Sequence, residues 1–402
     1  MLEKYGQCGG YQNFSIQYFA YCIKLILDTR YPIPDTEFVR LLSEIDVSGR
    51  RVFVRADLDV PLREAQVTKG ERLTTNAELE VFTRLTNLKP TVDYLLQHGA
   101  SQIVIAGHID RPLATCVMED GKPENYDPAK STKQLLETLQ NILGRDIEFT
   151  QDVIANEMKQ SRDRHANKKV FLLENLRFWP GEVANDLEFA KRLAALADIY
   201  VNEAFGNCHR NHASMVVLPG ILPAAAGLHL EQEVNVLSNL LSAPQRPFIA
   251  LVGGVKIETK VPVVENLAKV ADKVLVGGEL PIEIARTGQK FAENVLVGVL
   301  TGDTTELSQE STKLFIENVK NAKTIVWNGP LGLIEKGFTK ATTEVAKAIC
   351  ESEAYSVVGG GDTTHFLESN DLLSKFSFVS AGGGAMLEFL SGKKLPGIKA
   401  LE

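Results

Sequence analysis

The sequence predicts an α/β protein of two Rossmann-like, three-layer (αβα) domains, each with a parallel sheet between its helices. Three observations support this prediction. From about Val39 onward, short runs rich in valine, isoleucine and phenylalanine alternate with stretches of helical spacing, as in repeated βαβ units. The runs are apolar throughout, which is typical of strands buried on both faces of a sheet. About ten of them are present, too many for one comfortable sheet, so we divide them between two domains.

The first 38 residues do not follow this alternation. Apolar side chains recur there at helical spacing, at Ile16, Phe19, Ala20, Ile23 and Leu27, so an amphipathic helix is expected. The sequence YPIPD then ends it. We interpret 1–38 as an N-terminal extension, either an arm that packs on the first domain or a leader.

Four predicted strands follow in the first half: RRVFVRADL (50–58), SQIVIAGH (101–108), KKVFLLENL (168–176) and DIYVNEAF (198–205). The clearest helix is NDLEFAKRLAALAD (185–198), which begins with an Asn or Asp cap and has apolar residues at helical spacing. These elements define a first domain over 39–230.

A long helical stretch, LHLEQEVNVLSNLLSAPQRP (228–247), ends near Ala243 and Pro244. It predicts an interdomain helix over 231–245, which joins the two domains. Beyond it, five predicted strands define a second domain over 246–380. They are PFIALVGG (247–254), KVLVGG (273–278), KTIVWNGP (323–330), AYSVVGGGD (354–362) and FSFVSAGGG (376–384).

Composition limits the classes of function. The chain has 402 residues, 44% apolar and 23% charged, and a net charge of −8. These values are typical of a globular protein of two or three domains. An acidic chain has no general excess of cations for phosphate backbones, so we expect no nucleic-acid partner.

Cysteine usage and hydropathy indicate the compartment. The five cysteines are scattered and form no CxxC pair, which favours a reducing compartment without a disulfide framework or a zinc site. The apolar stretch FSIQYFAYCIKLIL contains Lys24 and is too short to span a bilayer. It lacks a small-residue cleavage site, so we expect no signal peptide, no membrane partner and a cytoplasmic location.

Two stretches repeat one pattern: YSVVGGGDTTHFLES (355–369) and FSFVSAGGGAMLEFLSG (376–392). Each is a strand, then three glycines, then a helix start. Glycine lets the backbone approach a ligand, and a helix N-terminus offers unpaired N–H groups to an anion. Two such turns predict a phosphate site, although glycine also serves tight packing alone. No GxxxxGK[ST] or helix-opening GxGxxG is present, so neither a P-loop nor a dinucleotide fingerprint is expected.

Ligands of open α/β sheets bind beyond the carboxyl ends of the strands. In the first half, the residues after the predicted strands are rich in cations, which favours a small polyanion site. A single arginine there is ordinarily solvated or paired with a helix, but several at successive strand ends favour the site. They include Asp57, Asp59, His108, Arg111, Arg177, His209, Arg210 and His212.

In the second half, the strand ends carry glycines, lysines and one aspartate. Lysine meets phosphate as a point charge, and aspartate suits a hard cation that keeps most of its waters. The set predicts a nucleotide with Mg²⁺: Gly254, Lys256, Lys260, Gly277, Gly278, Asn328, Pro330, Gly359, Gly360, Gly361, Asp362 and Thr363. An anion domain that faces a nucleotide domain predicts phosphoryl transfer in an interdomain cleft, with water expelled on closure.

Several of these motifs together resemble the phosphoglycerate kinase family, in the order in which that family has them. They are RADLDVP, GHIDRP, FLLENLRFWPGE, LAALADIYVNEAFGNCHRNHAS, RPFIALVGGVKIETK, IVWNGPLGLIE, VVGGGDTTHFLE and SAGGGAMLEFLSGKKLPG. The resemblance runs from about Val39 to Leu401. It implies reversible phosphoryl transfer between 1,3-bisphosphoglycerate with ADP and 3-phosphoglycerate with ATP, as in glycolysis and gluconeogenesis. It also implies Mg²⁺, a hinge-bending monomer, and a final segment, 381–402, that returns to the first domain.

The resemblance assigns roles residue by residue. Asp57, Asp59, His108, Arg111, Arg177 and Arg210 would bind phosphoglycerate. The stretch RLTNLKPTVDYLLQHGA is similar to the family helix that begins with its catalytic arginine, which makes Arg84 that residue, and Arg72 is the alternative. Lys256 and Lys260 would bind phosphate oxygens, Asp362 would hold Mg²⁺, and Asn328, Pro330 and Glu335 would line the nucleotide site. Gly360, Gly383 and Gly384 would face the transferring group.

Some positions depart from the family pattern. Asp59 stands where the family has asparagine, Thr259 where it usually has aspartate, and Ala381 where it has threonine. VGGELP lacks the GMAFTF run, ELSQES (306–311) replaces a DIGP-type loop, and the chain is shorter by tens of residues between Glu279 and Thr324. The changes gather around the adenosine side, so ATP and GTP both remain open. A non-catalytic relative that keeps the fold, or a related phosphotransferase with another nucleotide, is the alternative function.

Overall fold

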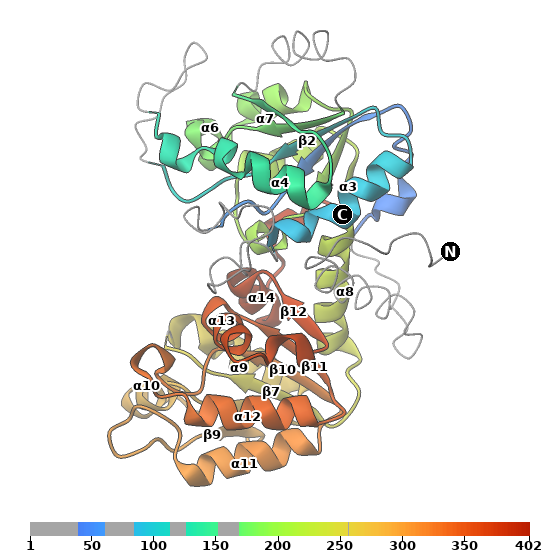
Figure 1. Ribbon diagram of the computed structural model, residues 1–402. Coiled ribbons are helices and arrows are strands. Elements are labelled where there is room, and N and C mark those ends of the chain that lie inside the picture. The colour runs from blue at the N-terminus through green and yellow to red at the C-terminus, as the bar shows by residue number, and fades with distance from the viewer. Residues whose placement is uncertain (1–38, 61–83, 113–125, 152–168, 256) are drawn as a thin grey trace, which may run out of the picture.

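The computed structural model describes residues 39–60, 84–112, 126–151, 169–255 and 257–402. The predicted N-terminal helix, the alternative catalytic arginine Arg72 and the predicted nucleotide ligand Lys256 lie outside these residues. The described chain forms two lobes, each built around a six-stranded parallel sheet with helices on both faces (Figure 1). The predicted fold class is confirmed.

The sheet of the first lobe has the strand order β3-β4-β2-β1-β5-β6. Its central strand β1 pairs in parallel with β2 and β5, so that Val52 lies between Ile103 and Ile199. The four strands predicted here are present, and two short ones, β3 and β6, were missed. The strands are β1 (Arg51–Arg55), β2 (Gln102–Ala106), β3 (Glu148–Thr150), β4 (Val170–Leu173), β5 (Ile199–Asn202) and β6 (Ala224–Ala226).

The sheet of the second lobe has the order β12-β11-β10-β7-β8-β9. The five predicted strands are present, and the three-residue edge strand β9 was missed. The strands are β7 (Phe248–Val252), β8 (Lys273–Val276), β9 (Val295–Val297), β10 (Thr324–Asn328), β11 (Tyr355–Gly359) and β12 (Phe378–Ser380).

The helices begin and end where local chemistry favours it. The predicted helix at 185–198 is α7, and its cap Asp186 accepts a hydrogen bond from the backbone N–H of Phe189. The long predicted helix is α8, which ends at Ser242 before Ala243-Pro244. The α-helices are α3 (Leu88–Gln97), α4 (Leu136–Leu143), α6 (Pro180–Val183), α7 (Leu187–Ala194), α8 (Leu228–Ser242), α9 (Ile257–Val270), α10 (Leu280–Thr287), α11 (Gln309–Lys320), α12 (Lys340–Glu351), α13 (Gly361–Ser369), α14 (Gly383–Leu390) and α15 (Pro396–Lys399).

The apolar core follows the pleat of the strands. Phe53 belongs to one cluster and its neighbours Val52 and Val54 to another, so β1 buries side chains on both faces. The cluster that contains Phe53 continues through Val234 of α8 to Phe248 of the second sheet. One apolar core therefore extends from the first lobe along α8 into the second, which positions the two sheets relative to each other.

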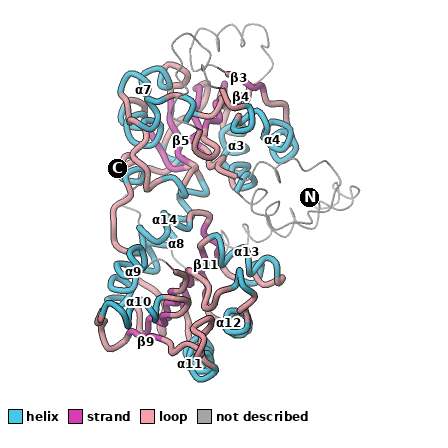
Figure 2. The backbone as a smooth tube through the Cα atoms, turned by 90° about the vertical axis from the view of Figure 1, so that its left-hand side faces the viewer, coloured by secondary structure: helices cyan, strands magenta, loops and turns pink. Residues whose placement is uncertain are grey.

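The end of the chain lies against the first lobe, as Figures 1 and 2 show. The N–H of Gly397, in α15, donates to the carbonyl of Cys208 at 2.8 Å. The carbonyl of Gly397 accepts from Asn202 Nδ2 at 3.3 Å. Leu401 accepts from the N–H of Arg40 at 3.3 Å. The chain thus crosses between the lobes twice, once through α8 and once after α14.

Two glycine-bearing loops meet backbone to backbone at the ends of β7 and β10. The N–H of Gly254 donates to the carbonyl of Pro330 at 2.9 Å. A Cβ at Gly253 would overlap the carbonyl oxygens of Pro330 and Gly329. Because backbone atoms cannot turn aside as a flexible side chain can, glycine is required at Gly253.

We expect Gly253→Ala to lower the thermal unfolding midpoint by about 5 °C, since overpacking against backbone costs about 1–3 kcal/mol. Gly302→Ala is the control, because a Cβ at Gly302 would meet no atom within 4 Å. Calorimetry of the full chain measures both. An unchanged midpoint for Gly253→Ala would contradict the close approach.

Candidate active site

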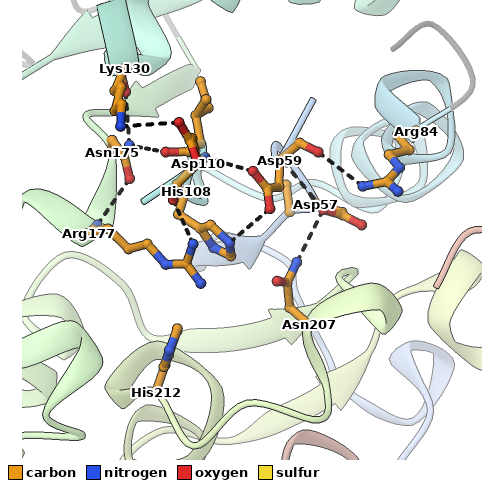
Figure 3. A network of polar contacts seen from close by, with 12 residues as sticks. Asp57, Asp59, Arg84, His108, Asp110, Lys130, Asn175, Arg177, Asn207 and His212 are labelled. Carbon is orange, nitrogen blue, oxygen red and sulfur yellow. Dashed lines mark hydrogen bonds and ion pairs between the residues drawn. The ribbon is translucent and has the colours of Figure 1, made fainter. Parts of the chain in front are cut away.

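The polar residues predicted after the strands of the first sheet do gather at one edge (Figure 3). Asp57 and Asp59 follow β1, His108 follows β2, and Arg177 lies beyond β4 in a short helical turn, Leu176–Phe178. Parallel strands all end at the same edge, which places these side chains around one space. The structure brings these predicted residues together, and the anion-binding role that the sequence predicts for them stays a prediction.

Asp57 is held in place by the loop that follows β5. Asn207 Nδ2 donates to Asp57 Oδ1 at 3.1 Å. The backbone of Gly206 lies so close that a Cβ there would be 2.8 Å from Asp57 Oδ2. The carboxylate is therefore fixed by a loop that lies 150 positions away in the sequence.

Asp59 is engaged by the protein through both carboxylate oxygens. Oδ1 accepts the N–H of Asp110 at 2.7 Å, and Oδ2 lies 3.5 Å from His108 Nε2. Burial alone would raise the pKa of Asp59, but the contacts with His108 and Asp110 and the charge of Arg177 lower it well below its usual range. The carboxylate is ionised and compensated, which removes much of the repulsion expected between it and an anionic substrate.

His108 is buried and takes one tautomer. Arg55 Nη2 lies 2.8 Å from His108 Nδ1, and because arginine can only donate, Nδ1 must accept. The proton then sits on Nε2, which faces Asp59. Burial, together with the positive charges of Arg55 and Arg177, lowers the pKa of His108 to about 4, although Asp59 opposes the shift. His108 is therefore a neutral donor at neutral pH.

A buried chain of polar groups supports this histidine. Arg55 is fully buried and donates through Nε to Ser214 Oγ at 2.9 Å. Ser214 in turn donates to the buried carboxylate of Glu182 at 2.6 Å. Sequence reasoning missed both Arg55 and Glu182. An arginine inside the apolar run RVFVRA was the available signal, because a charged residue within a buried strand needs a partner.

The arginines create a strongly positive region. Arg177 Nη1 donates to the carbonyl of Asp110 at 2.6 Å. Burial and the positive charges of Arg210, Arg55 and Arg111 lower the pKa of Arg177 to about 10, against the effect of Asp59. Cations that disfavour one another in the absence of a ligand form a site that an anion would stabilise.

His212 is also buried beside this region. Burial and the surrounding arginines Arg55 and Arg177 lower the pKa of His212 to about 3. Its ring packs edge-on against His108, with 6.2 Å between the ring centroids. His212 therefore contributes a neutral polar surface rather than a further charge.

Arg84 extends into the same space from the segment before α3. Its Nη1 donates to the backbone carbonyl of Asp59 at 3.0 Å. Arg84 also lines a cavity between the lobes, together with Asp57, Asn87, Glu203, Phe205, Gly206, His229 and Ala381. The choice of Arg84 over Arg72 stays a prediction, because Arg72 is outside the described chain.

In the second lobe, Lys260 is buried close to the glycine turn at Gly254. Its Nζ donates to Asn328 Oδ1 at 2.5 Å and to the carbonyl of Asn328 at 3.3 Å. Burial lowers the pKa of Lys260 to about 7, and Asp362 opposes the shift. A buried amine whose partners are neutral oxygens is poised to gain from an incoming phosphate.

The two repeated glycine turns touch each other. Gly360 has φ +98° and precedes α13, and a Cβ on Gly383, the first residue of α14, would lie 3.0 Å from Gly360 Cα. Beside them, the N–H of Gly329 donates to Thr363 Oγ1 at 2.9 Å. The second turn also reaches the first lobe, since a Cβ on Gly382 would lie 2.9 Å from Gly206 Cα.

Most of the other predicted nucleotide residues are packed against neighbouring atoms, whereas one of them is exposed. Gly254, Gly278 and Pro330 pack together at the strand ends of the second sheet, where Gly278 has φ +65° and little room for a side chain. Gly277 lies under Leu331. Glu335 is exposed in a short turn, Ile334–Lys336, and its role stays a prediction.

Asp362 is the predicted metal ligand, and it is exposed in the first turn of α13. Among the described residues, no group of three or more histidines, cysteines or carboxylates is arranged to hold a metal ion. A single exposed carboxylate beside the predicted phosphate site fits Mg²⁺, which keeps several waters and binds through one or two carboxylates and substrate phosphates.

Comparisons with known proteins bear on the whole chain. The family model described as "Phosphoglycerate kinase" matches residues 42–298 and 298–393. The chain belongs to the phosphoglycerate kinase family. It is 35% identical over 410 residues to the phosphoglycerate kinase of Desulforudis audaxviator, covering 90% of this chain and 99% of that relative. It is 34% identical over 409 residues to that of Leptospira biflexa, with 90% and 98% covered.

Solved phosphoglycerate kinase structures have the same fold. The enzyme from Coxiella burnetii matches with a TM-score of 0.71 at 28% identity, and that from Pyrococcus horikoshii with 0.70 at 26%. Each match covers 90% of this chain and 98% of the other. The family and the fold inferred from the sequence motifs are therefore confirmed. Within the described part of this phosphoglycerate kinase family member, no helix has the length and apolar character needed to cross a membrane.

We predict that His108 makes stability sensitive to acid. Its pKa falls from 6.5 to about 4 on folding, so the unfolded state binds more protons between these values and stability rises with pH there. Between pH 7 and pH 5, the wild type should lose about 2 kcal/mol more unfolding free energy than His108→Gln.

Urea unfolding at the two pH values measures this difference. His98→Gln is the control, because His98 is exposed and stacks on Tyr94 at the end of α3. Equal pH dependence in the wild type and His108→Gln would show that His108 is not buried as the neutral form.

Proposed function

We propose that this protein catalyses reversible phosphoryl transfer between 3-phosphoglycerate and ATP, with 1,3-bisphosphoglycerate and ADP as products. The observation that carries the proposal is the meeting of the two glycine turns at Gly360 and Gly383, with Gly382 against the loop at Gly206 beside the arginine cluster. Phosphoryl transfer depends mainly on positioning and on neutralising charge. Backbone N–H groups and guanidinium groups on opposite sides of one space are suited to both tasks.

The first lobe would bind phosphoglycerate. Arg177, with Arg111 and Arg210 nearby, would pair with phosphate and carboxylate oxygens through their planar guanidinium groups. The Nε2 hydrogen of His108, which faces Asp59 but makes no hydrogen bond within the described chain, would be donated to the ligand. Asp57 is placed to accept a hydroxyl hydrogen. These roles agree with the charge states of the groups at neutral pH, at which His108 is neutral and Arg177 is positively charged.

The second lobe would bind the nucleotide. Lys260 binds Asn328, whose side chain lies against Gly360. Phosphate oxygens at this turn would favour the protonated form of Lys260. The N–H groups at the starts of α13 and α14 would receive the triphosphate and the transferring group. Arg84 would approach from the first lobe and stabilise the charge that develops in transit.

Asp362 is the residue that would hold Mg²⁺ with the nucleotide. When bound, Mg²⁺ supplies charge neutralisation on the phosphate oxygens. The rest of the chemistry falls to this chain's own residues, which orient the two substrates and exclude water. Closure of the lobes around α8 would remove the water that otherwise accepts the phosphoryl group.

The remaining properties follow from the family and stay proposals. We expect a monomer that acts in the cytoplasm, in keeping with the free cysteines Cys208 and Cys350 in the described chain. ATP is the expected nucleotide. A direct comparison of ATP with GTP tests whether the altered adenosine side changes that preference.

We predict that Arg84→Ala lowers kcat by about a hundredfold or more, as the loss of one transition-state donor does in other enzymes.

Lys260→Ala should lower kcat and raise the KM for the nucleotide. A coupled assay with 3-phosphoglycerate, MgATP and glyceraldehyde-phosphate dehydrogenase measures both. The control is Lys347→Ala, an exposed lysine of α12. Wild-type kcat in Arg84→Ala would make Arg72 the candidate arginine.

We also predict that Asp362→Asn raises the Mg²⁺ concentration needed for half-maximal rate about tenfold or more, because the metal loses its carboxylate ligand. Titration of Mg²⁺ at saturating nucleotide gives this value. Asp371→Asn, an exposed residue just after α13, is the matched control. An unchanged Mg²⁺ dependence would remove Asp362 from the metal site.

A further inference from the structure

A group of polar side chains is buried where the two lobes join. Glu203 follows β5, His229 and Glu233 lie in the first two turns of α8, and Asn87 and Thr91 belong to the segment around the start of α3. Glu233 and Thr91 are 0% exposed, and Glu203 is 3% exposed. Burial of two carboxylates so close together requires a compensating role or a positive partner.

Glu203 is held by α3 and by the first turn of α8. Its Oε1 accepts the hydroxyl of Thr91 at 2.9 Å and the N–H of His229 at 3.0 Å. Its Oε2 finds no hydrogen-bond partner in the described chain. Burial raises the pKa of Glu203 to about 7, although His229 opposes the shift.

Glu233 instead reaches the second lobe. Its Oε1 accepts the N–H of Ala381 at 2.6 Å and lies 3.5 Å from His229 Nε2. Ala381 immediately precedes the glycines that open α14. The helix α8 therefore binds the second glycine turn where that turn begins, at Ala381.

His229 also reaches the segment that carries Arg84. Asn87, three residues beyond Arg84, has its Nδ2 3.1 Å from His229 Nε2. The contacts run without a break from Asn87 through His229 and Glu233 to Ala381. One end of this series, Asn87, is close in sequence to the proposed catalytic arginine, Arg84. The other end, Ala381, begins the proposed phosphoryl-binding turn.

We propose that His229 is a positioning residue for phosphoryl transfer, which joins the Arg84 segment, through Asn87, to the second glycine turn, through Glu233. This inference rests on the proposed function. It assigns to His229 no contact with substrate. Its effect is exerted on the relative placement of Arg84 and the turn that follows Ala381.

The protonation of His229 decides how strong these contacts are. His229 Nε2 faces both Glu233 and the side-chain amide of Asn87. It can serve both only by sharing its one hydrogen between the carboxylate and the amide oxygen of Asn87, which the neutral Nε2–H tautomer and the imidazolium both allow. In the imidazolium this hydrogen bond is charge-assisted and therefore stronger. The carboxylates that face His229 are Glu233, Glu203 and Asp57, and together they raise its pKa against the effect of burial. Arg84 lines the same cavity. The imidazolium form therefore strengthens the connection, and a rise in pH weakens it.

The kinetic experiment compares His229→Leu and His229→Gln with the wild type in the full chain. We expect His229→Leu to lower kcat about tenfold, because misplacement of reacting groups slows transfer. The KM for both substrates should stay within about twofold of the wild-type values, because neither substrate site is touched. His229→Gln, whose amide can still donate to Glu233, should recover much of the lost rate. His98→Gln is the exposed-histidine control.

The pH profile separates positioning from packing. In the wild type, kcat should fall as pH rises through the titration of His229, and this step should be absent in His229→Leu. If His229→Leu does not fold, His229→Gln still tests the step, since glutamine does not titrate. A profile that His229→Gln leaves unchanged, or a loss confined to KM, would overturn the proposal.

Nuclear magnetic resonance tests the connection without turnover. We expect the ring resonances of His229, assigned by their loss in His229→Gln, to titrate at lower pH in Glu233→Gln, because a facing carboxylate is removed. The Ala381 amide should follow the same titration in the wild type. An Ala381 amide that ignores His229 would refute the inference. No turnover in the wild type would instead contradict the proposed function and leave this measurement decisive for His229.

Discussion

Each strand of the two described sheets runs parallel to its neighbours, and a parallel pair requires a crossover that covers one face of the sheet. The strands are therefore buried on both faces, and polar side chains can leave the sheet only at its ends. In the first lobe, three strand ends, those of β1, β2 and β4, contribute Asp57, Asp59, His108 and Arg177, which meet because those ends share one edge. In the second lobe, the same constraint brings Gly254, Lys260 and Gly360 together. The site is a consequence of strand direction before it is a consequence of any one residue.

Below that edge, the first lobe maintains a buried charge. Desolvating the guanidinium of Arg55 and the carboxylate of Glu182 is unfavourable, and Ser214 and His108 offset this by filling the hydrogen bonds that the pair leaves open. The arrangement determines the tautomer of His108. That tautomer in turn compensates Asp59, the carboxylate that departs from the family pattern. An acidic residue is thus accommodated among arginines that face a proposed anion.

The junction between the lobes combines two kinds of contact with different properties. The apolar core that follows α8 is non-directional and resists separation of the lobes. The polar group of Glu203, His229 and Glu233 is directional, and its geometry depends on protonation and on small displacements. A junction of this kind can hold a defined arrangement and still change between a few discrete ones. The proposed closure of the lobes would take place across these contacts.

Much of this protein could be predicted from local patterns. Strand-length apolar runs and a capped amphipathic helix at Leu187–Ala194 are properties of neighbouring residues, so the fold class followed from them. The glycine turns could also be predicted, because the backbone conformation that requires glycine depends only on neighbouring residues. The strand Ala224–Ala226 was missed because three alanines carry no β-branched or alternating signal.

The tertiary structure alone decided which polar groups are partners. Glu203 meets Thr91 across 112 positions of the sequence, and Ala381 meets Glu233 across 148. The sequence predicted that Arg177 and His108 belong to the site. It left Arg55 and Glu182 unrecognised and indicated no role for His229. Burial and its effect on charge depend on the whole packed chain, because a side chain loses its water only where distant segments cover it. No local pattern records which segments those will be.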